Sequence, residues 1–306
     1  MTTQLTATEV YSLPDEFRNK GELSAWAKMT RPGEHIDSFL EGAFFAAQPS
    51  ANNATETCLF VTDVANGRVL SITKNGVWQV VHETSSVIHS MRIMPDGSHV
   101  AVDYDLGVLR LSEGSKPSVI SRGLENQPFL GLSDMCVASD GTLWFTDSGR
   151  TSLSDPTGRV YCLRPDSKLQ LVLDCVPYSN GICLSPDEKW VYVAATRANQ
   201  VWRFAASHAD SGTPMVGTYL QLSGGLGPDG LATNKLGWLA VAQAQAGVAY
   251  VFDDSGDLVF TVRLPKGLWT TSVAFDSDVP EDLYITEAQT GTVFLANQPI
   301  TIERCG

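Results

Sequence analysis

The five residues LWFTD (143–147) are the clearest example of a short unit that recurs along the chain. The unit is a short apolar run that is followed by a turn and then by a second apolar strand. Five other stretches are variants of it: LFVTD (59–63), VAVDY (100–104), VYVAA (191–195), LAVAQ (239–243) and LYITE (283–287). Short Val, Leu, Ile, Tyr and Trp runs bounded by Gly, Asp-Gly and Pro-Asp turns predict an all-β chain.

The spacing of these units predicts the architecture. Their first residues, 59, 100, 143, 191, 239 and 283, are separated by 41, 43, 48, 48 and 44 residues, which is the period of a four-stranded propeller blade. Six units therefore predict a six-bladed β-propeller. Residues 1–36 differ in character, because LPDEF (13–17) and the apolar Leu23, Trp26 and Ala27 have helical spacing. We expect a short N-terminal helical extension, 1–36, packed on a single propeller domain, 37–306. Residues 6–11 or 300–302 could supply the closing strand of the last blade.

A second repeating feature accompanies the units. Ahead of every unit lies a short apolar strand that opens with a polar residue. From these residues to their units the chain counts 18, 11, 10, 11, 10 and 11 residues. The first strand of each propeller blade lines the central channel, so we expect the six openings to converge in a ring. The predicted ring residues are Glu41, His89, Ser133, Asn180, Asp229 and Ser272. Each could alternatively be a turn residue that caps its strand.

The charge and hydrophobicity of the chain limit the classes of binding partner that we expect. The chain has 306 residues and a net charge of −13, with no Lys/Arg cluster to neutralise phosphates, so we expect no nucleic acid partner. No window approaches the roughly 18 apolar residues of a membrane span, and the first 20 residues do not resemble a secretion signal. We therefore expect a soluble, cytoplasmic protein with a small-molecule substrate and no obligate protein partner.

The stretch SGGLGPDGL (223–231) contains G-x-G-x-x-G at Gly225, Gly227 and Gly230. A dinucleotide-binding fingerprint should open a helix, but a strand, a polar turn and another strand follow here. Pro228 and the alternating pattern also oppose a helix. The glycines are better explained as turning the chain into the channel around Asp229.

Taken together, the motifs of the chain resemble those of the senescence-marker protein, gluconolactonase and luciferin-regenerating enzyme family of six-bladed propellers. The resemblance runs from about Leu13 to the C-terminus. It is carried by FLEG (39–42), FVTD (60–63) with GRV (67–69), SD (133–134), WFTD (144–147), DPTGRVY (155–161), SNG (179–181), TRAN (196–199), GPDGL (227–231) and LYITE (283–287).

The resemblance implies a metal-dependent hydrolase, lactonase-like, with one divalent ion at the channel mouth. The family's ligand pattern matches Glu41, Asn180 and Asp229, and its fourth position, usually Asn, is Ser133 here. Two carboxylates and an amide carbonyl suit Ca²⁺ or Mg²⁺, and Zn²⁺ can occupy such sites. Asp229 is then both ligand and candidate general base. Ser133 is a candidate holder of a bound water.

Several ring and lining positions depart from the family's lactonases. The departures are His89, Ser148, Ser154, Gln243 and Ser272. The loss of polar groups indicates a substrate other than a simple sugar lactone, larger or more apolar. His89 is a candidate general base or oxyanion donor, or a packed residue. The side chains expected to line the substrate pocket are Phe44, Tyr104, Phe129, Tyr178, Gln243, Trp269 and Ser272, although core packing explains the aromatic ones equally well.

Two other functions remain open from the sequence. The altered lining also fits an enzyme of natural-product biosynthesis that catalyses a cyclisation or hetero-Diels–Alder cycloaddition in an apolar pocket without a metal. A non-catalytic binding propeller is the third possibility. Retention of Glu41 and Asp229 together speaks against it, because two like charges would then be buried without a cation.

Overall fold

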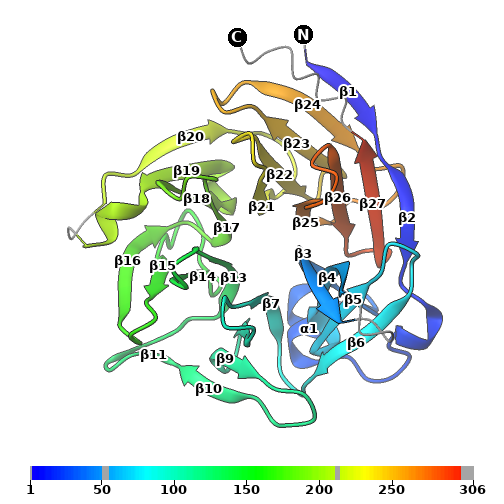
Figure 1. Cartoon of the computed structure of the whole chain (residues 1–306), viewed down its shortest axis with the longest axis horizontal. Helices are drawn as coiled ribbons and strands as arrows, with labels where there is room; N and C mark the ends of the chain where they lie inside the picture. The colour runs from blue at the N-terminus through cyan, green and yellow to red at the C-terminus, as the bar shows by residue number, and fades with distance from the viewer. Residues whose placement is uncertain (1, 50–54, 211–213, 298–306) are drawn as a thin grey trace.

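The protein is a six-bladed β-propeller, shown in Figure 1 as blades arranged around a central axis. The computed structural model describes residues 2–49, 55–210 and 214–297. Within each blade, consecutive strands pair antiparallel, and the first strand of the four is the innermost. The innermost strands of successive blades contact one another in a closed circle, from the first blade to the sixth and back to the first. The six-bladed, nearly all-β prediction is thus confirmed.

The strands of the first three blades follow one another along the chain. Blade 1 consists of β3 (Leu40–Pro49), β4 (Thr55–Asp63), β5 (Arg68–Ile72) and β6 (Trp78–Glu83). Blade 2 consists of β7 (Ile88–Ile93), β8 (His99–Asp103), β9 (Gly107–Leu111) and β10 (Ser118–Ser121). A small hairpin of β11 (Gly123–Leu124) and β12 (Gln127–Pro128) follows. Blade 3 consists of β13 (Leu132–Val137), β14 (Leu143–Asp147), β15 (Gly158–Leu163) and β16 (Leu169–Val176).

The last three blades complete the circle. Blade 4 consists of β17 (Ser179–Leu184), β18 (Trp190–Ala195), β19 (Gln200–Ala205) and β20 (Gly217–Gln221). Blade 5 consists of β21 (Gly227–Thr233), β22 (Leu239–Ala244), β23 (Val248–Phe252) and β24 (Leu258–Arg263). Blade 6 has β25 (Thr270–Phe275), β26 (Asp282–Glu287) and β27 (Thr292–Asn297). The repeating units of the sequence are thus the second strands of the blades.

The N-terminal segment closes the propeller. Strand β2 (Thr8–Ser12) pairs antiparallel with β27 and becomes the fourth strand of blade 6, as the first of the two sequence alternatives predicted. Strand β1 (Thr3–Thr6) pairs parallel with β24 and adds a fifth strand to blade 5. The expected boundary at residue 36 therefore does not separate an extension from the propeller. Residues 300–302, the other candidate for the closing strand, lie outside the described residues.

Apolar clusters fill the interfaces between neighbouring blades. Phe60, Ile88 and Met91, for example, pack between blades 1 and 2, and Val160, Val191 and Phe204 pack between blades 3 and 4. Corresponding clusters join blades 2 and 3, 4 and 5, 5 and 6, and 6 and 1. Because every blade is buried on both faces, its strands are apolar on both sides, which explains the near-continuous apolar runs of the sequence.

One short α-helix lies at the ring side of the propeller. Ser24 caps α1 (Ala25–Thr30) by accepting a hydrogen bond from the Ala27 amide at 3.2 Å. The helix buries Trp26 and Ala27 in a cluster with Phe39. In the part of the chain that the structure describes, the other helical turns are the 3₁₀ segments η1 (Asp15–Phe17), η2 (Val64–Asn66), η3 (Thr196–Ala198) and η4 (Ala206–Asp210). No helix among the described residues has the length and apolar character of a membrane span.

Candidate active site

The six predicted ring residues meet in space. Each is the second or third residue of an innermost strand, and an irregularity of strand pairing occurs at or beside each one. A β-bulge redirects side chains locally, so the irregularities turn these polar side chains toward the axis instead of into the sheet. All six line one void of about 10 Å³, roughly the space that a single water needs: Glu41, His89, Ser133, Asn180, Asp229 and Ser272.

The acid that ends several of the repeating units fixes the segment that leads into the ring. Asp63 Oδ1 accepts a hydrogen bond from the Phe39 amide at 2.9 Å. Asp147 Oδ1 accepts from the amides of Leu130 and Gly131 at 2.7 and 2.8 Å. Glu287 Oε1 accepts from the Trp269 amide at 2.9 Å. These carboxylates are completely buried, so the end of the second strand determines where the first strand begins.

Threonine hydroxyls connect the ring strands of neighbouring blades. The Thr62 hydroxyl donates to the carbonyl of His89 at 2.7 Å, and the Thr146 hydroxyl donates to the carbonyl of Asn180 at 2.6 Å. Thr196, just after the second strand of blade 4, donates to the carbonyl of Pro228, and Thr271 of β25 donates to the carbonyl of Leu40. The backbone at or next to four of the ring residues is thereby held from the adjacent blade, which favours a preorganised site.

Glycines follow the three ring residues that are candidate metal ligands. A Cβ on Gly181, after Asn180, would overlap the carbonyl oxygen of Asp229 in the next blade. A Cβ on Gly230, after Asp229, would lie 2.8 Å from the Cα of Ser272. The backbones around the axis approach so closely that no side chain fits at either position, which brings neighbouring ring residues together.

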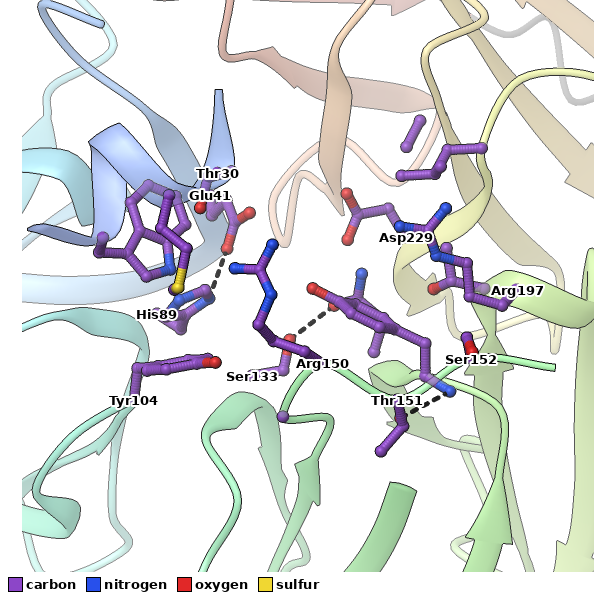
Figure 2. A pocket seen from close by; sticks show the side chains of 18 of the residues that line it. Thr30, Glu41, His89, Tyr104, Ser133, Arg150, Thr151, Ser152, Arg197 and Asp229 are labelled. Carbon is purple, nitrogen blue, oxygen red and sulfur yellow. Dashed lines mark hydrogen bonds and ion pairs between the residues drawn. The ribbon is translucent and has the colours of Figure 1, made fainter. Parts of the chain in front are cut away.

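Two carboxylates of the ring share a poorly solvated space. Burial raises the pKa of Asp229 well above its usual range, and the negative charges of Glu41 and Asp134 raise it further, while a hydrogen bond from Asn180 opposes the shift. His89 Nδ1 lies 3.1 Å from Glu41 Oε2. The Ser133 hydroxyl donates to Asn180 Oδ1 at 2.7 Å (Figure 2). The ring therefore contains an acidic pair in need of a positive charge.

The donor set fits a hard divalent cation. Glu41, Asn180 and Asp229 offer two carboxylates and an amide, and the charge of Glu41 adds to burial in raising the pKa of Asp229. The described residues contain no group of three or more His, Cys, Asp and Glu side chains placed to hold a metal. A site here would thus depend on the amide oxygen of Asn180, with Ser133 beside it.

A larger cavity opens above the ring. Its volume is about 530 Å³, and Glu41, His89, Ser133, Asn180 and Asp229 line it as well as the small void. Of the expected pocket side chains, Tyr104, Tyr178 and Trp269 line this cavity. Tyr178 has a positive φ of 65°, an unusual conformation for a residue with a large side chain. Burial, together with the charges of Asp229 and Glu41, raises its pKa to about 12.

The structure places four other expected pocket residues elsewhere. Phe44 stacks on Phe60 in the interface between blades 1 and 2. Phe129 packs edge-on against Phe145 and Tyr161 in the interface between blades 2 and 3. The amide of Gln243 donates to Asn199 Oδ1 and to the carbonyl of Gly224, so this side chain holds the glycine-rich loop. Ser272 lines the void, where its hydroxyl accepts from the Ala43 amide at 3.0 Å.

Sequence reasoning missed much of the upper wall. Helix α1 contributes Trp26, Met29 and Thr30, and the loop between β14 and β15 contributes residues 149–154. Thr196 and Ala244 also line the cavity, and each comes directly after one of the repeating units. Extending the phase of the repeat by one or two positions would have found these residues and the cavity residue Arg197. No signal in the sequence shows where α1 packs.

Comparisons with known proteins agree with the architecture. The sequence model of the SMP-30/Gluconolactonase/LRE-like region matches residues 47–289. Lactonase drp35 of Staphylococcus aureus strain MRSA252 is 31% identical over 138 residues, which cover 44% of this chain and 42% of that protein. The matched segment therefore spans less than half of this curated relative.

Solved structures have the same fold at low identity. The gluconolactonase XC5397 from Xanthomonas campestris superposes with a TM-score of 0.70 at 22% identity, covering 90% of this chain and 94% of that one. A calcium-binding protein, regucalcin, from Agrobacterium tumefaciens superposes with a TM-score of 0.70 at 20% identity, covering 85% and 90%. At these identities the likeness supports the fold alone.

Proposed function

The chain belongs to the SMP-30/Gluconolactonase/LRE-like family, and from that premise we propose that it is a metal-dependent hydrolase that opens a lactone or related ester at the channel mouth. The observation that carries the proposal is the convergence of Glu41, Asn180 and Asp229 on one void directly beneath a cavity of about 530 Å³. The names of the relatives, a lactonase and a gluconolactonase, are consistent with this activity.

In this proposal Glu41, Asn180 and Asp229 hold one divalent cation, with Ser133 at the fourth position. Oxygen-only donors favour Ca²⁺ or Mg²⁺ over Zn²⁺. The structural neighbour described as a calcium-binding protein makes Ca²⁺ the first choice. A cation bound there would act as a Lewis acid toward the lactone carbonyl and the attacking water.

The side chains around the ring have distinct tasks. Asp229 lines both the void and the cavity, so it is placed to accept a proton from water that adds to the lactone carbonyl. His89 acts as a positioning residue, because its Nδ1 faces Glu41 and its ring packs between Trp26 and Tyr104. Ser133 orients the amide of Asn180 through the bond to Oδ1.

The lining and the volume of the cavity indicate the size of the substrate. Trp26, Phe39, Tyr104 and Trp269 give it a substantial aromatic surface, and its volume exceeds what a bare lactone ring occupies. We therefore propose a lactone with more substituent bulk than a simple sugar lactone. Nothing in the comparisons supports the metal-independent cyclisation that the sequence left open.

The test is lactone opening by protein that has been stripped with a chelator and then supplied with Ca²⁺, Mg²⁺, Mn²⁺ or Zn²⁺. We expect acid release from a panel of five- and six-membered lactones with at least one of these ions, and none without. Asp229→Asn should abolish the activity, whereas Asp254→Asn, an exposed aspartate of the same blade, should leave it unchanged. Lactone opening by stripped protein at the full rate would refute the metal dependence. A metal-replete protein that opens no lactone in the panel would refute the activity.

A further inference from the structure

Two arginines line the cavity without a carboxylate partner. Arg150 and Arg197 are exposed, whereas Ser133, His89 and Asp229 are buried, so the arginines lie nearer the solvent and the ring forms the floor. Among the described residues, neither guanidinium has a hydrogen bond or an ion pair to an acidic side chain. The arginines are thus available to a ligand.

The backbone on both sides of Arg150 is firmly held. Gly149, with a φ of 52°, donates its amide to the carbonyl of Gly131 at 3.0 Å. The Thr151 hydroxyl donates to the carbonyl of Ser148 at 2.8 Å and accepts from the amide of Tyr178 at 3.1 Å. The backbone position of Arg150 at the cavity therefore follows from a fixed turn. In Figure 2 the Arg150 side chain lies among the other side chains that line the cavity.

Nearby acids are already engaged with other groups. Asp147, three residues before Arg150, has its Oδ2 3.6 Å from Arg159 and its Oδ1 on two backbone amides. Burial raises the pKa of Tyr104, and the charge of Arg150 opposes that shift, so Arg150 acts on a phenol of the cavity wall. Arg150 therefore adds a positive charge beside Tyr104 in the cavity wall.

Arg197 is held in a different way. It lies in η3, where its amide donates to the carbonyl of Pro177 at 3.1 Å. The guanidinium lies over the ring of Tyr178 at 5.6 Å from the ring centroid. Such stacking fixes the plane of the guanidinium and leaves its N–H donors free at the edge. In Figure 2 Arg197 lies on the Asp229 side of the cavity, away from Tyr104.

We propose that Arg150 and Arg197 together bind an anionic group of the substrate, which makes this protein selective for lactones that carry a carboxylate, sulfonate or phosphate. Guanidinium forks bind such oxyanions with two parallel hydrogen bonds, more strongly than neutral donors do. With acids on the floor and arginines above, the cavity orients a dipolar substrate, its anion outward and its lactone carbonyl toward Asp229. This inference rests on the proposed function for the lactone, but the anion site can be tested by binding alone.

The experiment measures binding of ring analogues that cannot be opened. Isothermal titration of the metal-replete protein compares a neutral six-membered sugar lactam with the same lactam bearing a carboxylate or a sulfonate on its exocyclic carbon. We expect the anionic lactams to bind at least about 10-fold more tightly, since hydrogen bonds between a guanidinium and an oxyanion are stronger than those between neutral groups. Higher ionic strength should reduce this preference because the arginines are partly exposed.

The variants identify the groups responsible. Arg150→Ala and Arg197→Ala should each reduce the preference at least about 5-fold while changing neutral lactam affinity less than about 2-fold, and Arg150→Lys should retain part of it. Arg263→Ala, which removes an exposed arginine of β24 outside the cavity lining, should leave the preference unchanged. Equal affinity for neutral and anionic lactams, or a preference that survives both alanine variants, would overturn the proposal. An arginine-dependent preference in a protein that opens no lactone would refute only the hydrolase.

Discussion

The buried carboxylate of Asp147, which ends the repeating unit LWFTD, makes stability depend on pH in a direction that can be calculated. Burial raises the pKa of Asp147 from 3.8 to about 6, against the lowering effect of its two backbone hydrogen bonds and of Arg159. Below pH 3.8 the carboxyl is protonated in both the folded and the unfolded chain. Between pH 3.8 and 6 only the unfolded chain ionises, so the fold loses stability as pH rises.

The difference between 3.8 and about 6 corresponds to roughly 3 kcal/mol of lost stability above pH 6. Asp147→Asn keeps an acceptor oxygen for the amides of Leu130 and Gly131 but cannot ionise. About 1 kcal/mol of the loss has already occurred at pH 4.5, so the advantage of the variant over the wild type should grow by about 2 kcal/mol between pH 4.5 and pH 8.

Urea unfolding followed by tryptophan fluorescence at both pH values measures this difference. Asp254→Asn, which changes an exposed acid, should show little pH-dependent difference from the wild type. Asp147→Ala leaves the amides of Leu130 and Gly131 without their acceptor, and Gly131 is buried, so the variant should destabilise the protein by about 2–4 kcal/mol at either pH. The reasoning fails if the free energy of unfolding of the Asn variant, relative to the wild type, does not increase as pH rises. Burial would then not raise the pKa of Asp147.

Three other perturbations test the fold and the ring. Deleting residues 2–12 removes β1 and β2 and exposes the edges of blades 5 and 6, so the melting temperature should fall by at least about 10 °C, as followed by circular dichroism; an unchanged melting curve would contradict closure by the N-terminus. Gly181→Ala should cost about 2–4 kcal/mol in urea unfolding because its Cβ overlaps the Asp229 carbonyl oxygen, whereas Gly217→Ala, with no atom within 4 Å of the added Cβ, should be nearly neutral; equal effects would contradict the close approach of the ring strands. Ser133→Ala removes the hydrogen bond to Asn180 and should lower both stability, by about 1 kcal/mol, and Ca²⁺ affinity in calorimetric titration; unchanged affinity would show that Ser133 does not orient Asn180.

The ring could be predicted from the sequence because it repeats with the fold. Glu41, Asn180 and Asp229 occupy equivalent places in strands whose period the chain reveals, and that period alone places them around one axis. The cavity wall follows no such period. The position of Arg150 depends on the turn at Gly149. The position of Trp26 depends on the packing of α1 against Phe39, and α1 is not part of the repeat.

The aromatic residues show why burial could not be separated from function in the sequence. Phe44 and Phe129 lie in the interfaces between blades, whereas Tyr104 and Trp269 line the cavity, and all four are large aromatic residues. Which of them faces the cavity is decided by local register, including the bulge between Glu41 and Phe44. A shift of one residue in a strand moves a side chain from one face to the other.

The most direct test of the central claim is calorimetric titration of Ca²⁺ into chelator-stripped protein. The account predicts one ion bound per wild-type chain, and no binding to Asp229→Asn or Asn180→Ala under the same conditions. Wild-type protein that binds no divalent ion, or an Asp229→Asn variant that binds Ca²⁺ as the wild type does, would contradict it.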